Sequence, residues 1–302
     1  MPLPGLNPGT VVHERFVIVD QIGEGATAYV FRARDLRVRA IVALKLTKRR
    51  EPAAAASLQR EADALSSVQH PHVTSFVAFG TLEDGRAFLA MQYASGRTLR
   101  DLLRNRPLAI DDTLLLGVVV AGALGAIHSA GLIHRDLKPD NIIVPCYAGM
   151  PSFPAAMLVD LGVFGTMQRR DGPDGAAPRT RWGRVSGTAL YMAPEQLAGR
   201  AQSTATDAYA LGLLLHECIF GTVPFANEEL RSWRDPETGG FLAFTGALVR
   251  RRLAERITLP AVPEVDMALR KLMSELLEPD PDLRPAAMAE IARSLRDLRM
   301  RR

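Results

Sequence analysis

Apolar and polar residues alternate along the first third of the chain in the manner of β-strands. Residues 11–46 and 74–93 are rich in Val, Ile, Phe and Tyr and are interrupted by glycine-containing turns, which is the pattern of an antiparallel sheet. Between these two regions Pro52 opens a segment with helical spacing that runs to about Ser67. The first third therefore predicts a small sheet that carries one helix.

Beyond Leu99 the apolar residues recur mostly with helical spacing. Residues 114–127 place apolar side chains on one face and residues 208–215 are apolar almost throughout, so both segments are predicted to be buried helices. Two short apolar runs, 142–144 and 157–159, flank a connector rich in Pro and Gly and predict a hairpin. The second part of the chain is therefore mainly helical.

The two patterns together predict an α+β protein with two lobes. We expect an N-terminal extension at residues 1–10, a lobe of antiparallel sheet and one helix at 11–93, a mainly helical lobe at 94–298 and a basic tail at 299–302. A chain of 302 residues, of which 47% are hydrophobic, is long enough to bury the core that such a fold needs.

Composition narrows the classes of protein to consider. The net charge is +4, but the basic residues are spread over many segments and are not gathered with aromatic residues, so we expect no nucleic-acid partner. Two cysteines, Cys146 and Cys218, cannot build a disulfide framework, which fits a reducing compartment. The apolar runs fall short of the ~20 residues of a bilayer span, and the N-terminus lacks a signal-peptide pattern. We therefore expect a cytoplasmic protein without a membrane segment.

The clearest chemistry lies in residues 134–141, whose sequence is HRDLKPDN. This stretch brings a carboxylate, an ammonium and a carboxamide into one turn-forming context. Asp136 can accept the proton of an attacking hydroxyl, Lys138 can offset charge on a moving phosphoryl group, and Asn141 can offer an oxygen to Mg²⁺. The set is suited to phosphoryl transfer.

A predicted buried strand supplies a further charge. In residues 41–46 a lone lysine, Lys45, shares one face of the strand with Ala43. Because burying an unpaired ammonium is costly, Lys45 either reaches water at a sheet edge or meets an acidic partner. Glu61 lies on the inward stripe of the predicted first helix, so we expect a Lys45–Glu61 ion pair.

Residues 22–30, IGEGATAYV, place two glycines in a turn between predicted strands. Glycine lets the backbone bend close over phosphate oxygens, although such a turn is more often only a turn. A dinucleotide-binding fold would need a helix after the glycines, whereas the residues that follow alternate as a strand. This segment is therefore a candidate phosphate-binding loop outside the dinucleotide-binding class.

Taken in order, these segments resemble the signature of eukaryotic-like (Hanks-type) serine/threonine protein kinases of bacterial style. The resemblance extends from residue 11 to about 298 and includes the segments 160–162, DLG, and 187–195, GTALYMAPE. The family usually has Phe where Leu161 stands, and the spacing from Asn141 to Asp160 is longer than we expect for it. The resemblance implies the bilobal protein-kinase fold and transfer of a phosphoryl group from ATP to Ser/Thr hydroxyls of proteins, with Mg²⁺, or alternatively Mn²⁺, as the ion.

The resemblance also assigns roles by position. The catalytic set would be Asp136, Lys138, Lys45 and Glu61, the metal ligands Asn141 and Asp160, the substrate platform Gly187 and Thr188, and the structural residues Glu195, Arg284 and Asp207. Of the structural residues, Glu195 would pair with Arg284, and Asp207 would hold the backbone of the catalytic loop.

The ATP site implied by the resemblance lies between the two lobes. It would consist of Ile22, Gly23, Glu24, Gly25, Ala26, Thr27, Ala28, Tyr29, Val30, Ala43, Lys45, Met91, Gln92 and Ala94. Lys45 would reach the α and β phosphates and Met91 would be the gatekeeper. The Gln92 carbonyl and the Ala94 amide would face the adenine.

Regulation is expected from the segment between residues 162 and 187. Arg135 precedes the catalytic Asp136, which marks the type of kinase in which a phosphate on this segment pairs with that arginine. Thr180 and Ser186 are the candidate autophosphorylation sites. A homodimer would allow this modification in trans.

Two other functions use related folds. A pseudokinase would serve as a nucleotide-binding scaffold or interaction module, but its usual mark is the loss of a catalytic group, and none of the five expected groups is missing here. A small-molecule kinase, such as an antibiotic phosphotransferase, does not need the extended shelf that residues 187–195 would provide. A protein kinase remains the preferred hypothesis.

Overall fold

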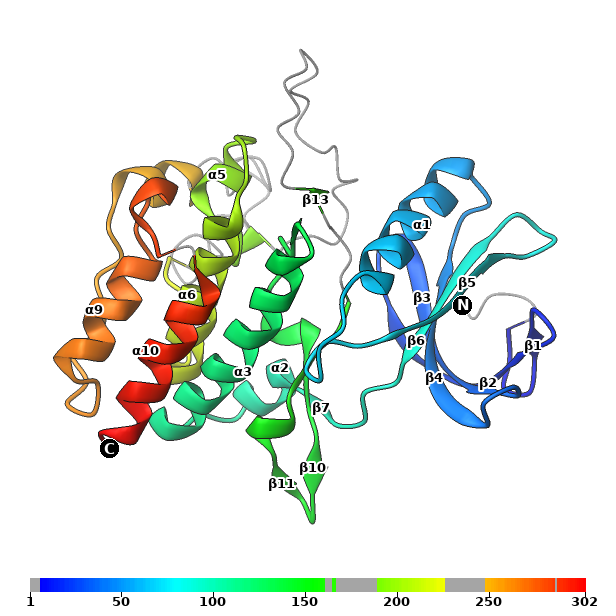
Figure 1. Ribbon diagram of the computed structural model, residues 1–302, viewed down its shortest axis with the longest axis horizontal. Coiled ribbons are helices and arrows are strands. Elements are labelled where there is room, and N and C mark those ends of the chain that lie inside the picture. The colour runs from blue at the N-terminus through cyan, green and yellow to red at the C-terminus, as the bar shows by residue number, and fades with distance from the viewer. Residues whose placement is uncertain (1–5, 161–164, 167–188, 226–247, 286) are drawn as a thin grey trace, which may run out of the picture.

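The structure is a computed structural model that describes residues 6–160, 165–166, 189–225, 248–285 and 287–302. It has a strand-rich N-terminal lobe and a mainly helical C-terminal lobe (Figure 1). The helices are α1 (Pro52–Ser66), α2 (Leu99–Leu103), α3 (Ile110–Ser129), α5 (Pro194–Leu197), α6 (Thr204–Phe220), α9 (Met267–Leu276) and α10 (Met288–Met300). The strands are β1 (Val11–Val12), β2 (Phe16–Glu24), β3 (Ala28–Asp35), β4 (Ala40–Thr47), β5 (Phe76–Thr81), β6 (Ala87–Gln92), β7 (Arg97–Thr98), β8 (Leu132–Ile133), β9 (Ile142–Val144), β10 (Cys146–Tyr147), β11 (Met150–Pro151), β12 (Met157–Leu158) and β13 (Gly165–Thr166).

The N-terminal lobe is built on a six-stranded antiparallel sheet in the order β1-β2-β3-β4-β6-β5. Its strands alternate as predicted, because successive side chains point to opposite faces. Ala43 joins the core cluster beneath α1, whereas Val42 and Leu44 belong to a separate cluster on the other face. Both faces of the sheet are therefore buried at β4. Lys45, two residues after Ala43, lies on the same face as Ala43 and so faces α1.

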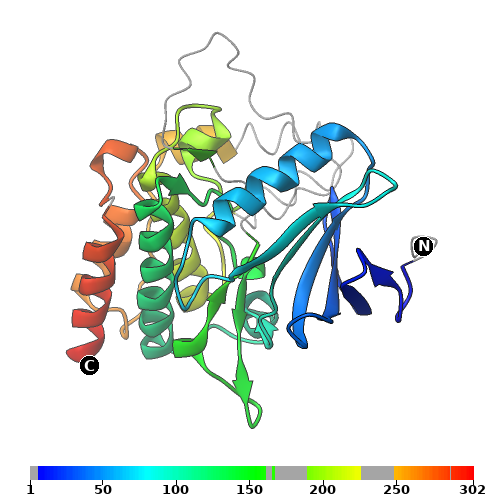
Figure 2. The same ribbon diagram turned by 45° about the vertical axis from the view of Figure 1, so that its right-hand side comes forward.

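Helix α1 lies across one face of this sheet (Figure 2). It begins at Pro52, whose fixed φ suits the first turn, and ends at Ser66, one residue before the predicted end. Leu58, Ala62 and Leu65 are buried along its inner stripe together with Glu61, whereas Asp63 is exposed. The amphipathic spacing thus fixes which acidic side chain of α1 faces the sheet.

Helices α3 and α6 pack together in the C-terminal lobe, and α10 lies along α3 (Figure 1). Gly117 permits a close approach, since a Cβ atom there would lie 3.0 Å from side-chain atoms of both Leu215 and Leu295. By length and composition alone α3 could cross a membrane, which our sequence reading did not expect. It is longer than its apolar run because its first turn contains Asp111 and Asp112, acidic residues that are favourable at a helix N-terminus.

Short strands form the side of the C-terminal lobe nearest the N-terminal lobe. The predicted hairpin is confirmed by antiparallel pairing of β9 with β12, and β9 also pairs with β7. Gly96, just before β7, has φ +156°, and a Cβ there would lie 2.4 Å from the carbonyl oxygen of Val144. Glycine therefore allows the chain that leaves the sheet to pass directly against β9.

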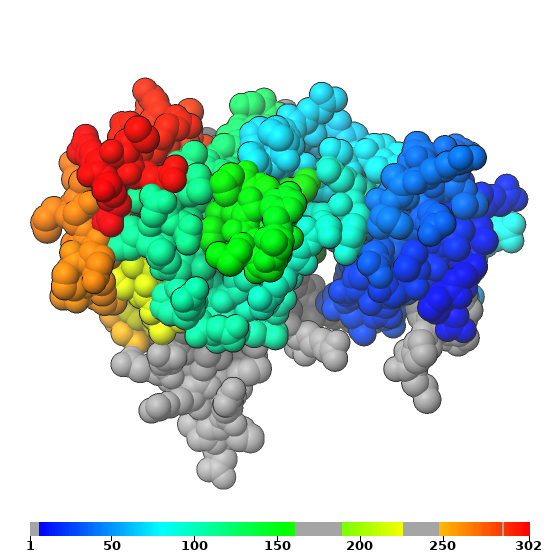
Figure 3. Space-filling view, turned by 90° about the horizontal axis from the view of Figure 1, so that it is seen from below, coloured from blue at the N-terminus to red at the C-terminus, as the bar shows by residue number. Residues whose placement is uncertain are grey.

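The connector between β9 and β12 contains a second hairpin. Strands β10 and β11 pair antiparallel around Ala148 and Gly149, both of which have positive φ. Tyr147 and Met150 are exposed there, and Figure 3 shows this green segment on the lower surface of the molecule. This hairpin accounts for the unusual spacing between Asn141 and Asp160.

The C-terminal boundary differs from the prediction. Helix α10 continues to Met300, so the expected basic tail at residues 299–302 starts inside the helix. Leu295 and Leu298 are buried along its inner face, and the Arg299 guanidinium pairs with Asp111 at 3.0 Å. Packing against α3 therefore carries the helix through the basic sequence.

Candidate active site

Lys45 lies between two carboxylates, the buried Glu61 and the partly exposed Asp160. Its ammonium is 2.7 Å from Glu61 Oε1 and 2.6 Å from Asp160 Oδ1. The strand β4, the helix α1 and the segment after β12 each contribute one of these three groups. The predicted Lys45–Glu61 pair is confirmed, and Asp160 is a second partner that the sequence did not reveal.

Lys45 and Asp160 stabilise each other's ionised forms, whereas burial raises the pKa of the Glu61 carboxyl above its ordinary value. Burial opposes the charge on Lys45, but the Asp160 and Glu61 carboxylates outweigh it and raise the pKa of Lys45 above its ordinary value. In return, the Lys45 ammonium holds the pKa of the Asp160 carboxyl below its ordinary value, although burial acts in the other direction. Lys45 therefore stays cationic and Asp160 anionic near neutral pH.

The catalytic-loop residues converge on Asp136. The Lys138 ammonium donates to both carboxylate oxygens, at 2.9 and 2.8 Å, and the Asn141 amide nitrogen donates to the main-chain oxygen and to Oδ2 of Asp136. Pro139 begins a single 3₁₀ turn, η1 (Pro139–Asn141), which brings Asn141 back toward Asp136. The turn chemistry of HRDLKPDN therefore gathers the three predicted groups into one cluster.

Asp207 supports this loop from the first turn of α6. Its buried carboxylate accepts hydrogen bonds from the main-chain N–H of His134 at 2.9 Å and of Arg135 at 2.8 Å, and it lies 2.8 Å from His128 Nε2. Arg135 has φ 68°, a conformation that is uncommon for a side chain of this size. Asp207 thus makes the contacts with the loop backbone that its predicted scaffold role requires, and His128 is an additional contact that sequence reasoning missed.

His134 is fully buried under the loop. Its Nδ1 accepts from the main-chain N–H of Asp136 at 3.2 Å, and burial lowers the pKa of its imidazole below the ordinary value. A neutral ring is required for this acceptor role. His134 therefore orients the backbone of the catalytic residue without carrying charge.

Asn141 and Asp160 lie close together in space because the segments that carry them pair. The main-chain N–H of Val159 donates to the Asn141 carbonyl at 2.8 Å, and the β9–β12 pairing sets this register. Because the Asn141 amide nitrogen donates to Asp136, the amide oxygen of Asn141 is the atom that could bind a cation. One amide oxygen and one carboxylate fit Mg²⁺, which takes few protein ligands when phosphates and water supply the rest. No group of three or more His, Cys, Asp or Glu within the described ranges is arranged to hold an ion without such help.

The predicted phosphate loop is a tight turn between β2 and β3. The main-chain N–H of Gly25 donates to the Ala28 carbonyl at 2.8 Å, and Glu24 pairs with Lys48 at 2.6 Å. Lys48 also lies over the ring of Tyr29, 4.5 Å from its centroid. The Glu24–Lys48 ion pair ties the start of this loop to the residue that follows β4. The sequence alone did not predict this pair.

The segment that joins the lobes carries the expected adenine-facing residues. Met91 is buried at the end of β6, as a gatekeeper would be. The Gln92 carbonyl accepts from the Thr74 hydroxyl at 2.8 Å, so part of its acceptor capacity is already used within the protein. A carbonyl oxygen has two lone pairs, and one remains for a further donor.

A buried ion pair anchors the end of the predicted platform. Arg284 donates to both oxygens of Glu195, at 2.9 and 3.0 Å, and its side chain is fully buried. This confirms the predicted structural pair. Gly187 and Thr188, the candidate phosphosites Thr180 and Ser186, and Leu161 lie outside the described residues.

The lobe arrangement, the catalytic loop and the buried ion pairs point to one family, and the comparisons agree. The chain matches the protein kinase domain family over residues 16–294, and it belongs to this family. It is 37% identical to serine/threonine-protein kinase pkn3 of Myxococcus xanthus over 73% of this chain and 40% of that protein. It is 34% identical to serine/threonine-protein kinase PknE of Mycobacterium tuberculosis over 69% of this chain and 35% of that protein. The chain spans less than half the length of these relatives.

Proposed function

We propose that this chain phosphorylates serine and threonine hydroxyls of protein substrates with ATP as donor and Mg²⁺ as the ion. The observation that carries the proposal is the contact of Lys45 with both Glu61 and Asp160, beside the Asp136–Asn141 cluster. A buried lysine held between two carboxylates of different elements has little value as a stability device. It places a fixed positive charge where nucleotide phosphates would enter.

The glycine-rich turn supports the nucleotide part of the proposal. Neither Gly23 nor Gly25 has a positive φ, and a Cβ atom would lie 3.5 Å from its nearest neighbour at Gly23 and 3.6 Å at Gly25, which are ordinary contact distances. The fold itself therefore does not demand glycine at these two positions. Close approach of a ligand to the backbone gives a reason for them.

Each residue then has a defined task. Asp136 accepts the proton of the attacking hydroxyl, and Lys138, already on that carboxylate, offsets the charge that develops on the transferred group. Lys45 orients the α and β phosphates. Bound Mg²⁺, held through Asn141 and Asp160, supplies charge neutralisation of the phosphate oxygens. Catalysis is mainly positioning and electrostatic stabilisation.

Replacement of Asp136 tests the mechanism directly. We expect Asp136→Asn to lower the rate of phosphate transfer by roughly 100- to 10,000-fold, with ATP affinity nearly unchanged because Asp136 does not hold the nucleotide. The measurement is incorporation of label from [γ-³²P]ATP into a generic protein acceptor, with ATP binding followed separately. A wild-type protein that binds ATP but transfers nothing would support the pseudokinase alternative. An unchanged rate in the variant would remove Asp136 as the general base.

Serine and threonine specificity is supported by the relatives' names and by Lys138, two residues after Asp136, as the Ser/Thr branch of the family has it. Phosphoamino-acid analysis of the labelled acceptor tests this point. Phosphotyrosine as the main product would contradict it.

We also propose regulation by autophosphorylation at Thr180 or Ser186, in trans within a transient homodimer. The support is Arg135, whose Nε is buried and has no hydrogen-bond partner among the described residues, and whose pKa burial lowers. A phosphate nearby would satisfy this guanidinium. Intact mass and peptide mapping after incubation with ATP test the proposal, and an active enzyme with an unmodified loop would refute it.

A further inference from the structure

Three consecutive arginines, Arg250, Arg251 and Arg252, occupy the helical residues 248–254, and they have different surroundings. Arg250 is exposed and Arg251 is half-buried, whereas Arg252 is completely buried. Arg252 donates through its two terminal nitrogens to the main-chain carbonyls of Leu190, at 2.5 Å, and of Met192. The Arg252 guanidinium therefore binds the main chain at the residues before and after Tyr191.

Burial of Arg252 has a cost that an apolar side chain would avoid. An arginine cannot lose its charge in a protein, so its guanidinium needs acceptors when it leaves water. The guanidinium lies 5.8 Å from the centroid of Tyr209, and Arg284 lies 4.7 Å from the same centroid. An apolar side chain could fill the space that Arg252 occupies. Space filling therefore does not explain why an arginine bonds the carbonyls of Leu190 and Met192 here.

A second arginine holds the side chain of the same turn. Arg100, from α2, donates to the Tyr191 hydroxyl and to Glu217 of α6, each at 2.5 Å, and the Tyr191 hydroxyl donates to Glu217. The Arg100 Nε is 3.3 Å from Asp140, the neighbour of Asn141 in the catalytic loop. Arg100 therefore ties Tyr191 to the loop that carries Asp136.

A third contact links the turn to the same loop. The Gln196 amide nitrogen donates to the Arg135 carbonyl at 2.9 Å, and its amide oxygen accepts from the main-chain N–H of Ala193 at 3.0 Å. The segment 190–193 is thus fixed to the catalytic loop at two points, through Arg100 and through Gln196. Arg252, from the helical residues 248–254, holds the backbone of the same segment.

We propose that Arg252 and Arg100 are positioning residues for the acceptor peptide. They hold Leu190–Met192 as a rigid shelf at a set distance from Asp136, so that the acceptor hydroxyl meets the general base. This inference rests on the proposed protein-kinase function. Its consequence is specific: loss of either arginine impairs use of a peptide but leaves ATP binding and slow transfer to water intact, because neither residue lines the Lys45 site.

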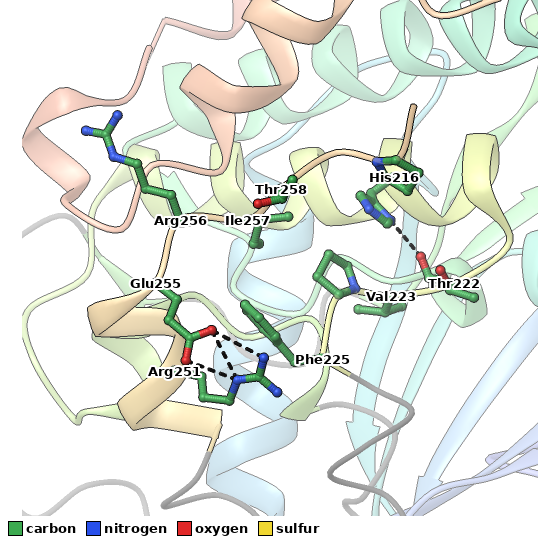
Figure 4. A pocket seen from close by; sticks show the side chains of 11 residues that line it. His216, Thr222, Val223, Phe225, Arg251, Glu255, Arg256, Ile257 and Thr258 are labelled. Carbon is green, nitrogen blue, oxygen red and sulfur yellow. Dashed lines mark hydrogen bonds and ion pairs between the residues drawn. The ribbon is translucent and has the colours of Figure 1, made fainter. Parts of the chain in front are cut away.

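The adjacent arginines provide controls with the same charge. Arg251 contacts other residues: it lies over the Phe225 ring, 4.3 Å from its centroid, and pairs with Glu255. These residues line a cavity of about 390 Å³ near the end of α6, together with His216 and Thr222 (Figure 4). Arg250, on the exposed side of the same turn of helix, is the better matched control because its replacement disturbs neither the shelf nor the cavity.

The experiment compares Arg252→Met, Arg252→Lys, Arg100→Met and the control Arg250→Met. For each we measure kcat and KM for an acceptor peptide, KM for ATP, the rate of ATP hydrolysis without peptide, and thermal unfolding. Loss of a hydrogen bond from a charged donor predicts about a tenfold fall in kcat/KM for the peptide in Arg252→Met and Arg100→Met. ATP KM and hydrolysis should stay within about twofold of wild type. Lysine keeps the charge but cannot reach both carbonyls, so Arg252→Lys should recover part of the loss.

The outcomes separate this inference from the proposed function. A wild-type protein that phosphorylates no peptide refutes the proposed function; amide hydrogen exchange at residues 189–193 then decides the inference. Faster exchange there in Arg252→Met than in Arg250→Met supports the shelf, and equal exchange overturns it. With an active wild type, peptide kcat/KM unchanged in Arg252→Met, or a parallel fall in ATP hydrolysis, overturns it as well. If Arg252→Met does not fold, Arg252→Lys and Arg100→Met carry the test.

Discussion

The buried pair Glu195–Arg284 offers a sharp test of how the C-terminal lobe is held together. The exposed fractions of the two side chains are 4% and 0%. Replacement of Arg284 by Met leaves the Glu195 carboxylate with the Thr206 hydroxyl, at 2.8 Å, as its one remaining donor in the described part of the chain. An uncompensated buried charge costs about 3–5 kcal/mol. We therefore expect Arg284→Met to lower the free energy of unfolding by that amount.

Removal of both charges should cost much less than removal of one. In the double variant Glu195→Leu/Arg284→Met neither charge of the pair is left buried without its partner, and such replacements are often neutral or stabilising. We expect the double variant to lie within about 1–2 kcal/mol of wild type, with the single variant melting on the order of 10 °C lower.

Urea unfolding at pH 7, followed by far-UV circular dichroism, measures both variants and the single Glu195→Leu. These three free energies and that of the wild type complete a double-mutant cycle. A loss of stability in the double variant equal to the sum of the losses in the two single variants would show that the two side chains are not coupled, and our account of the pair would then be wrong.

Three further predictions follow from the site. Glu61→Gln keeps the shape of the side chain but weakens its ion pair with Lys45, so we expect kcat/KM for ATP to fall roughly 10- to 100-fold. The control Asp63→Asn, on the exposed side of α1, should change kcat/KM little. Equal activity of Glu61→Gln and wild type would show that the pair is dispensable. Burial alone would raise the pKa of Asp207, but hydrogen bonds from His128 and the loop amides hold it below its ordinary value. Because the unfolded carboxyl then binds more protons, Asp207 stabilises the protein above pH ~4 and this stabilisation is lost as the pH falls further; urea unfolding from pH 3 to 7 should lack this part of the slope in Asp207→Asn. The lowered pKa of His134 acts in the same direction below about pH 6.5, so in an NMR titration its ring should protonate at a lower pH in the folded protein than in the urea-unfolded chain.

Much of the fold could be predicted because local patterns were consistent with tertiary structure. The alternation of residues 41–46 correctly placed Lys45 on the face of the sheet beneath α1, and the helical stripe correctly placed Glu61 toward it. Two inward charges of opposite sign in neighbouring elements leave few arrangements, so their ion pair followed. The turn chemistry around Pro139 likewise gathered the catalytic groups.

What the sequence could not supply depends on contacts between distant segments. The approach of Asp160 to Lys45 requires the C-terminal lobe to close against the sheet, and no local pattern encodes that distance. The Thr74–Gln92 hydrogen bond similarly depends on the path of the chain beside β6. The burial of Arg252 beside the exposed Arg250 is a third case, because the orientation of one helical turn against its neighbours decides which of these arginines is buried.

The position of Asp207 has a consequence for how the enzyme comes into being. The geometry of HRDLKPDN depends on a carboxylate that follows it by about seventy residues and that reaches it only when α6 has docked on α3. On the proposed function, a nascent chain that has left the ribosome only as far as the catalytic motif would lack the carboxylate that holds this loop. Phosphate transfer would then begin only after α6 has been synthesised and has packed against α3.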